Sequence, residues 1–253
     1  MSDRIEPLGP SAPGTDPAEL LAAEGISPGH LAEKPDGRPR VMGVMVGSAD
    51  GRAVVAGHAG GLSSPADRTH YRSLRTAADA CLVGPSTLVI EQYSTLLDDH
   101  QRERRESLGL SPEPLLATIS RGLDSRLAEL EIFNIPGRPV RVYTESAEEF
   151  PACKGDVEVV RFAEGALGPA ACITDLGAEG ASMVLCEGGP SLLGAFFAAK
   201  LVDDLFLTVS PQVVGGNGIN VVEAPTFDPP VGMELLSAGR GGSHLFLHYA
   251  VRG

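Results

Sequence analysis

One segment constrains the fold of this chain more than any other: an apolar run that passes through a glutamate and two glycines into a second apolar run. It covers residues 184–194 and reads VLCEGGPSLLG. Pro190 suits the first turn of a helix, where its fixed φ is helical and its missing N–H is not needed. The glycine pair allows close approach to the backbone, and the free N–H groups at a helix start suit a phosphate. The segment therefore predicts a buried strand followed by a helix whose start is a candidate phosphate site. A simple strand-to-helix turn is the alternative.

The rest of the chain alternates strand-like and helix-like segments. Apolar runs typical of strands cover 41–46, 80–83, 115–119, 140–143, 157–160, 205–209 and 245–249. Helices are predicted over 64–78, after 84–87, over 167–178 and over 192–201. Such alternation predicts an α/β fold with a mostly parallel central sheet and helices on both faces. The last fifth of the chain, with strands and no room for long helices, predicts an antiparallel C-terminal edge.

Composition bounds the organisation and the partners. Residues 1–38 are rich in Pro, Gly and Ala and predict a partly ordered N-terminal extension with one short helix over 16–24, so 39–253 form a single domain. The highly charged segment 98–114 predicts a solvated surface insertion. A net charge of −13 argues against a nucleic-acid binder. No run is long enough to span a bilayer, no secretory signal is recognisable, and the four cysteines lack metal-ligand spacing. We therefore expect a cytoplasmic protein with no metal site and no membrane contact.

Three loops of a kind that binds phosphate follow predicted strands. They lie at 84–87 (GPST), 120–122 (SRG) and 188–191 (GGPS). In parallel sheets, ligands bind beyond the carboxyl ends of the strands. The three loops together favour an extended phosphate-bearing ligand such as a dinucleotide. The first strand lacks the G-x-G-x-x-G fingerprint after it, which disfavours an ordinary Rossmann domain.

Charged residues near these loops suggest further contacts. Arg68, Arg72 and Arg75 share one face of the helix after Pro65, which indicates either anion capture or a solvated face. A carboxylate at Glu187 would repel phosphate, so it either faces a ligand with N–H donors, such as an aminopyrimidine or pterin ring, or caps the turn. Asp67, in the first turn of a helix, is also ordinary compensation of the helix dipole. The histidines 58, 70, 244 and 248 are expected to pack or lie at the surface rather than to catalyse.

Several motifs, in this order, resemble one family. They are SADGR at 48–52, Ser64-Pro65, Leu74-Arg75, the run 80–87, EGGP at 187–190 and LVDDL at 201–205. The set resembles the riboflavin-biosynthesis reductases, the pyrimidine-reductase domain of the bifunctional bacterial deaminase–reductase, which has a dihydrofolate-reductase-like fold. The resemblance covers about residues 40–250.

The resemblance implies an activity and a set of contacts. It implies an NADPH-dependent oxidoreductase, usually a homodimer, that reduces 5-amino-6-(5-phosphoribosylamino)uracil to the ribitylamino product by hydride transfer. Glu187 and Asp67 are the candidate catalytic residues, and with Arg75 they would line the substrate pocket. NADPH would be bound by residues on the three loops and next to them: Gly84, Thr87, Glu91, Ser120, Arg121, Gly188, Gly189, Pro190, Ser191 and Leu192. Arg121 would meet the 2′-phosphate.

The chain also departs from the family pattern. The zinc deaminase motifs are absent, so we expect a reductase without that domain. The family's Lys-Trp pair in the first loop is Gly60-Gly61 here, and a basic residue after the cofactor loop falls near Asp98. These changes leave open a dihydrofolate or pterin reductase with the same cofactor, and a dinucleotide-binding module without catalysis.

Overall fold

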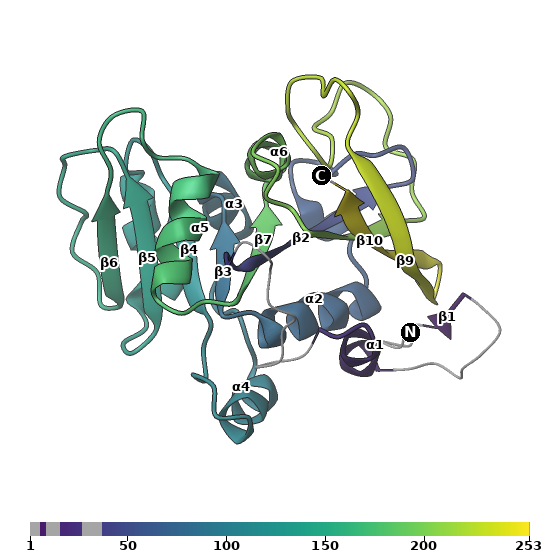
Figure 1. Ribbon diagram of the computed structural model, residues 1–253, viewed down its shortest axis with the longest axis horizontal. Helices are drawn as coiled ribbons and strands as arrows, with labels where there is room; N and C mark the ends of the chain where they lie inside the picture. The colour runs from purple at the N-terminus through teal and green to yellow at the C-terminus, as the bar shows by residue number, and fades with distance from the viewer. Residues whose placement is uncertain (1–5, 9–15, 27–36, 253) are drawn as a thin grey trace.

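A single mixed sheet runs through the computed structural model, which describes residues 6–8, 16–26 and 37–252. Its order is β1-β9-β10-β8-β2-β7-β3-β4-β5-β6 (Figure 1). From β8 to β6 all neighbours are parallel, whereas β10, β9 and β1 continue the sheet antiparallel. The strands are β1 (Glu6–Pro7), β2 (Arg40–Ser48), β3 (Ala80–Val83), β4 (Leu115–Ile119), β5 (Pro139–Thr144), β6 (Asp156–Arg161), β7 (Met183–Gly188), β8 (Asp204–Ser210), β9 (Gly232–Gly241) and β10 (His244–Arg252). The predicted parallel sheet with an antiparallel C-terminal edge is confirmed.

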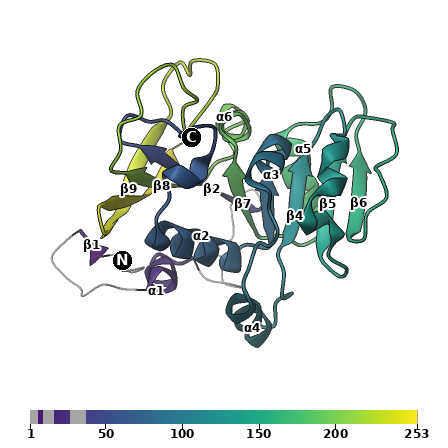
Figure 2. The ribbon, with the colours of Figure 1, turned by 180° about the vertical axis from the view of Figure 1, so that it is seen from behind.

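Helices cover both faces of this sheet, as Figures 1 and 2 show from opposite sides. Leu21, Leu74 and Leu88 from α1, α2 and α3 pack in one buried cluster, and Ile173 and Phe196 from α5 and α6 pack in another. All six residues of β7 are buried because the strand lies between the two clusters. The helices are α1 (Pro17–Ala23), α2 (Pro65–Ala77), α3 (Pro85–Glu91), α4 (Asp99–Ser107), α5 (Pro169–Ala178) and α6 (Pro190–Ala198), with short 3-10 turns η1 (Ala59–Gly61), η2 (Ser125–Glu129) and η3 (Glu131–Asn134).

The predicted N-terminal extension is only partly described. Helix α1 confirms the short helix expected over 16–24, and Leu21 and Ile26 are buried against α2. Residues 1–5, 9–15 and 27–36 of the extension lie outside the described residues. In the described part, no helix combines the length and the apolar character needed to cross a membrane.

The charged segment 98–114 is not simply solvated, and that prediction is wrong for Arg105, Glu113 and Pro114, which are buried. Arg105 is 2% exposed, although its neighbours on α4 lie in solvent. Its guanidinium donates to the carbonyls of Thr76 and Ala78 at 2.8 and 2.6 Å and to Ser111 at 2.7 Å. The last carbonyls of a helix lack partners within the helix, so a cation that satisfies them is stabilised there. Arg105 therefore ties α4 to the C-terminal end of α2.

Strand β9 was not predicted. Most of its residues are exposed, so it lacks the alternation of apolar and polar residues by which a half-buried strand is recognised. Its nine partners on β10 hold it in the sheet instead.

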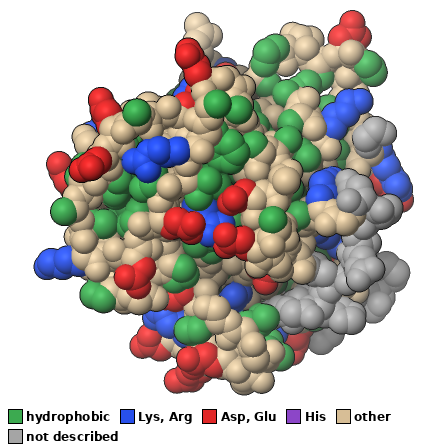
Figure 3. All heavy atoms as spheres, turned by 60° about the vertical axis from the view of Figure 1, so that its left-hand side comes forward, with side chains coloured by type: hydrophobic (Ala, Val, Ile, Leu, Met, Phe, Trp, Pro, Cys, Tyr) green, Lys and Arg blue, Asp and Glu red, His purple; other side chains and the backbone are tan. Residues whose placement is uncertain are grey.

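On the face shown in Figure 3, acidic and basic side chains are interspersed rather than gathered by sign.

Candidate active site

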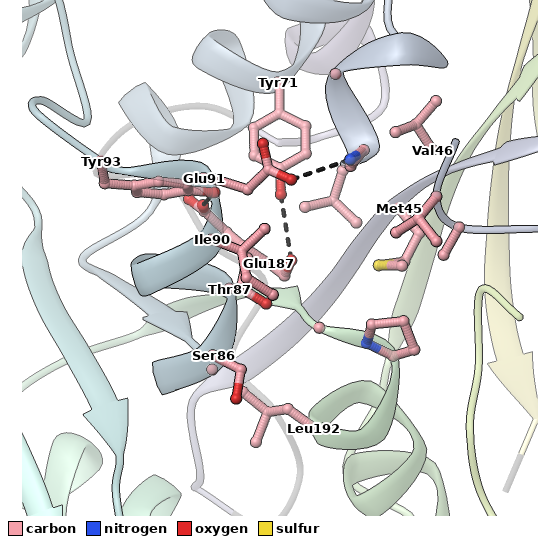
Figure 4. Close-up of a pocket in the computed structure, with 18 of the residues that line it drawn as sticks. Met45, Val46, Tyr71, Ser86, Thr87, Ile90, Glu91, Tyr93, Glu187 and Leu192 are labelled. Atoms are coloured by element: carbon pink, nitrogen blue, oxygen red, sulfur yellow. Dashed lines mark hydrogen bonds between the residues drawn. The ribbon is translucent and has the colours of Figure 1, made fainter. Parts of the chain in front are cut away.

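A pocket of about 880 Å³ opens at the carboxyl ends of the central parallel strands. Residues of β2 form one wall, α2 and α3 form others, and the turn between β7 and α6 completes the lining (Figure 4). Ligand sites of parallel sheets lie at this edge. Two of the three predicted phosphate loops, 84–87 and 188–191, reach the pocket.

Glycines allow these two loops to touch. The N–H of Gly84 donates to the carbonyl of Gly188 at 2.6 Å. A Cβ at Gly189 would lie 2.9 Å from Oγ1 of Thr87, and one at Gly188 would lie 2.9 Å from the sulfur of Met45. Gly188 also has a φ of +82°, which side chains disfavour. The positive φ at Gly188 and the close approach of the two loops therefore favour glycine at both positions.

The start of α6 remains open to a ligand. No side chain caps it, and Pro190, Ser191 and Leu192 line the pocket directly after the uncapped turn. Thr87 and Glu91 border the same space from α3, and Glu91 accepts a hydrogen bond from the N–H of Ala59 at 3.0 Å (Figure 4). An uncapped helix start with small neighbours is suited to phosphate.

Glu187 and Arg75 form a buried, two-pronged ion pair. Nε of Arg75 donates to Oε1 of Glu187 and Nη2 to Oε2, each at 2.7 Å. The Glu187 side chain is 0% exposed and that of Arg75 12%. Burial disfavours the charge on Arg75, but Glu187 outweighs it and holds the pKa of Arg75 well above its usual value. The pair is therefore close to neutral as a unit.

Two tyrosines surround this pair, and sequence reasoning missed both. The rings of Tyr71 and Tyr93 lie 4.9 and 5.1 Å from the Arg75 guanidinium. Tyr93 donates to Oε2 of Glu187 at 3.2 Å, and Tyr71 donates to the Glu187 carbonyl at 3.3 Å (Figure 4). Burial, and then Glu187, raises the pKa of both phenols. The spacing of Tyr71 four residues before Arg75 was a usable signal; nothing local marked Tyr93.

The loop that carries Tyr93 is held from outside the pocket. Arg138 donates to the carbonyl of Ser94 at 2.9 Å, and Arg102 donates to that of Leu97 at 2.7 Å. Glu113 pairs with both guanidiniums, at 2.7 Å from Arg102 and 2.9 Å from Arg138. This cluster fixes the loop backbone, and through it the position of Tyr93.

Asp67 is the second buried carboxyl group of the pocket. It is 4% exposed, and Ser63 donates to its Oδ2 at 2.7 Å. Burial raises its pKa, while hydrogen bonds from Ser63 and Thr208 act in the opposite direction. Burial therefore shifts Asp67 toward its protonated form, and a carboxyl group perturbed in this way that faces a pocket is a candidate for proton transfer.

The structure does not bring every expected residue to this pocket. Ser120 accepts a hydrogen bond from the N–H of Asp124 at 2.8 Å and lies outside the lining. Arg121 also lies outside it, paired with Glu145 at 2.7 Å. Their predicted contacts with a cofactor stay predictions, and Arg121 has an alternative partner.

Two of the histidines considered, His70 and His248, are buried in the fold. His70 packs edge-on against Phe206 and Phe246, and burial lowers its pKa to about 4. His248 is 2% exposed and bridges Glu24 and Asp204. Among the described residues, no group of three or more His, Cys, Asp or Glu is placed to hold a metal ion.

Comparisons with known proteins agree with this architecture. The model of the RibD C-terminal domain matches residues 39–247. The chain is 23% identical over 211 residues to the riboflavin biosynthesis protein RibD of Escherichia coli, covering 81% of this chain and 57% of that protein. It is 28% identical over 149 residues to the 2,5-diamino-6-ribosylamino-4(3H)-pyrimidinone 5′-phosphate reductase of Archaeoglobus fulgidus, covering 56% of this chain and 66% of that protein.

A solved structure shares the fold. It is a pyrimidine reductase-like protein from Corynebacterium diphtheriae, with a TM-score of 0.75 and 21% identity over 94% of this chain and 100% of that one. The chain spans about half the length of the RibD proteins that it matches, 57% for Escherichia coli and 53% for Mycobacterium tuberculosis.

Proposed function

Because the chain belongs to the family of the RibD C-terminal domain, we propose that it is an NADPH-dependent reductase of riboflavin biosynthesis. It reduces 5-amino-6-(5-phosphoribosylamino)uracil to the ribitylamino product. The observation that carries this proposal is the pocket itself, in which two glycine-fitted loops and an uncapped helix start adjoin two buried carboxyl groups. We also propose that residues 39–253 act as one reductase domain.

The residues present fit a phosphate-bearing dinucleotide. The N–H groups at the start of α6 would hold the phosphates of the dinucleotide, and Thr87 and Glu91 would contact other parts of it. A side chain at Gly189 would press on Oγ1 of Thr87, so glycine leaves room for Thr87 to face the cradle. When bound, NADPH supplies the hydride for the reduction.

The other side of the pocket is suited to the substrate. The neutral Arg75–Glu187 pair forms a rigid wall with the two tyrosines, and rigid walls orient a reacting carbon without reorganisation. Asp67 can hold a proton at its carboxyl group because burial raises its pKa. It would supply that proton to the substrate as hydride arrives at the sugar carbon, with solvent restoring it afterwards.

Dihydrofolate is a second candidate substrate, and one observation favours it. Glu187 has most of its acceptor positions occupied by Arg75 and Tyr93, whereas Asp67 accepts from the hydroxyl groups of Ser63 and Thr208 and has no bidentate partner among the described residues. A carboxyl group in that state can pair with the 2-amino and ring N–H groups of a pterin. Of the two buried carboxyl groups of the pocket, Asp67 fits this role better than Glu187.

Steady-state NADPH oxidation with the two substrates in parallel tests the proposal. We expect turnover with the phosphoribosylamino-pyrimidine, lost in Asp67→Asn and retained in the control Arg126→Gln, which alters an exposed arginine on η2. Turnover with dihydrofolate alone would replace the proposed substrate. NADPH binding without oxidation of either would contradict catalysis and favour a binding module.

Assembly and location complete the proposal. Met233, Leu235 and Leu236 of β9 are 45–51% exposed, an apolar edge that supports a homodimer. Light scattering of the purified protein would test this, and a monomer at micromolar concentration would contradict it.

All four cysteines are free thiols, which supports a reducing compartment such as the cytoplasm.

A further inference from the structure

We propose that Arg68 and Arg72 of α2 bind the anionic group at the far end of the substrate and so set its specificity. This inference rests on the proposed function and adds to it the residues that recognise the tail of the substrate. Both arginines line the pocket, and both are exposed at its rim. Because they lie four residues apart in a helix, their side chains project from the same face.

Arg75, the third arginine of this face, is already committed. It gives Nε and Nη2 to Glu187 and Nη1 to the carbonyl of Leu96 at 3.1 Å. The carboxylate of Glu187 cancels its charge at close range. Positive potential for an incoming anion must therefore come from Arg68 and Arg72, the other two cations that line the pocket.

Arg68 and Arg72 are held loosely. Nη1 of Arg72 lies 3.7 Å from Oδ2 of Asp98, and the two side chains are 50% and 49% exposed. Arg68 has no ion pair with another described residue at salt-bridge distance. Exposed pairs at such distances contribute little, so an anion can displace Asp98 from Arg72. Two guanidiniums on one helix face match the oxygens of a phosphate or a carboxylate.

The three carboxyl groups that line the pocket each have a partner other than Arg72. Glu91 accepts the N–H of Ala59, Glu187 faces Arg75, and Asp67 accepts from Ser63 while it also interacts electrostatically with Arg68. Only Asp98 opposes Arg72 directly. In a chain with a net charge of −13, Arg68 and Arg72 are the exposed cations of the pocket lining, where an anionic tail can meet them.

The pairing also accounts for the acidic residue at position 98, where the family resemblance leads one to expect a basic residue. Here the positive charge comes from α2, and Asp98 moderates it. Two opposite effects follow: removing Arg68 and Arg72 weakens binding of the anionic tail, whereas neutralising Asp98 strengthens it.

The test compares substrates with and without the tail. KM and kcat are measured for the phosphorylated pyrimidine and its dephosphorylated counterpart in wild type, Arg68→Gln/Arg72→Gln, Asp98→Asn and the control Arg126→Gln. Asp98→Asn keeps the helix cap, since Oδ1 of Asp98 accepts the N–H of Gln101 at 3.0 Å and an asparagine oxygen can do the same.

We expect the double variant to raise KM for the phosphorylated substrate roughly ten- to hundredfold, with little change in kcat or with the dephosphorylated substrate. Asp98→Asn should lower that KM roughly two- to fivefold. Equal effects on both substrates, or none, would overturn the inference while leaving the proposed function intact.

Two further arms separate this inference from the proposed function. If only dihydrofolate is reduced, the tail is the glutamate carboxylates, and the same variants are compared on dihydrofolate and dihydropteroate. If neither substrate reacts, calorimetry with ribose 5-phosphate, and ribose as its control, replaces turnover. Binding of ribose 5-phosphate that is equal in wild type and the double variant would then refute the role of Arg68 and Arg72.

Discussion

Removing one partner of the Arg75–Glu187 pair should destabilise the whole fold. Glu187→Gln keeps the shape of the side chain but removes its charge. One amide oxygen can still accept from Nε of Arg75, while the amide NH₂ faces the donor Nη2 across what is now a 2.7 Å contact. Because Arg75 is largely buried, its charge then lacks compensation. Loss of one member of a buried ion pair costs about 3–5 kcal/mol of unfolding free energy.

Urea unfolding and thermal melting measure this effect. In a chain of this size, that loss corresponds to a fall in Tm of roughly 6–20 °C. Asp98→Asn is the matched control, because its pair with Arg72 is half-exposed and 3.7 Å long; we expect it to change stability by less than about 1 kcal/mol. A loss below about 1 kcal/mol for Glu187→Gln as well would refute a tight buried pair in solution.

The same variant tests the role of Glu187 in the pocket. Glu187 holds Arg75 and accepts a hydrogen bond from Tyr93, and so it shapes the part of the pocket proposed to bind the substrate. The loops proposed to hold NADPH line another part of the same pocket. At a temperature where it is folded, Glu187→Gln should therefore lose turnover or substrate affinity and keep NADPH binding. Wild-type values for all three would show that Glu187 has no part in the reaction.

Three further predictions concern the framework around the site. Burial lowers the pKa of His248, but its hydrogen bonds to Asp204 and Glu24 outweigh burial and raise that pKa. The stability that His248 contributes should therefore be complete below about pH 6.5 and fall as pH rises through the raised pKa. His248→Gln should flatten this dependence of the unfolding free energy on pH, as measured by urea unfolding. In Gly194→Ala the new Cβ would lie 2.1 Å from the carbonyl oxygen of Glu223, so we expect a loss of about 1–3 kcal/mol, and an unchanged Tm would argue against this packing. Arg105→Met should cost about 1–3 kcal/mol or more, because it leaves buried carbonyls at the end of α2 without a donor; full stability by urea unfolding would show that solvent reaches them.

Local signals explain why much of the fold was predictable from sequence. Pro65 and Pro190 mark the first turns of α2 and α6. The apolar runs at 80–83 and 115–119 predict the bounds of β3 and β4 that the structure shows. The helix after β7 ends at Ala198 instead of continuing to Leu201, because Lys200 has a φ of +55° and the N–H groups of Lys200 and Leu201 turn back to the carbonyls of Phe197 and Phe196.

Contacts between distant residues explain what was missed. Arg75 and Glu187 are 112 residues apart, so their types and positions suggested a shared pocket but not that each would neutralise the other. Arg105 sits in a charge run typical of solvated helices, and only its reach to α2 buries it. Tyr93 depends on a loop held by Glu113 and two arginines, which no local pattern reveals.

The most direct measurement follows the hydride itself. NADPH carrying deuterium at its transferable position is incubated with the protein and the phosphoribosylamino-pyrimidine, and the product is analysed by mass spectrometry. We expect the ribitylamino-pyrimidine with one deuterium on the former sugar carbon that was linked to nitrogen. Unreacted substrate, or a product without deuterium, would contradict a reductase that transfers hydride from NADPH to this pyrimidine.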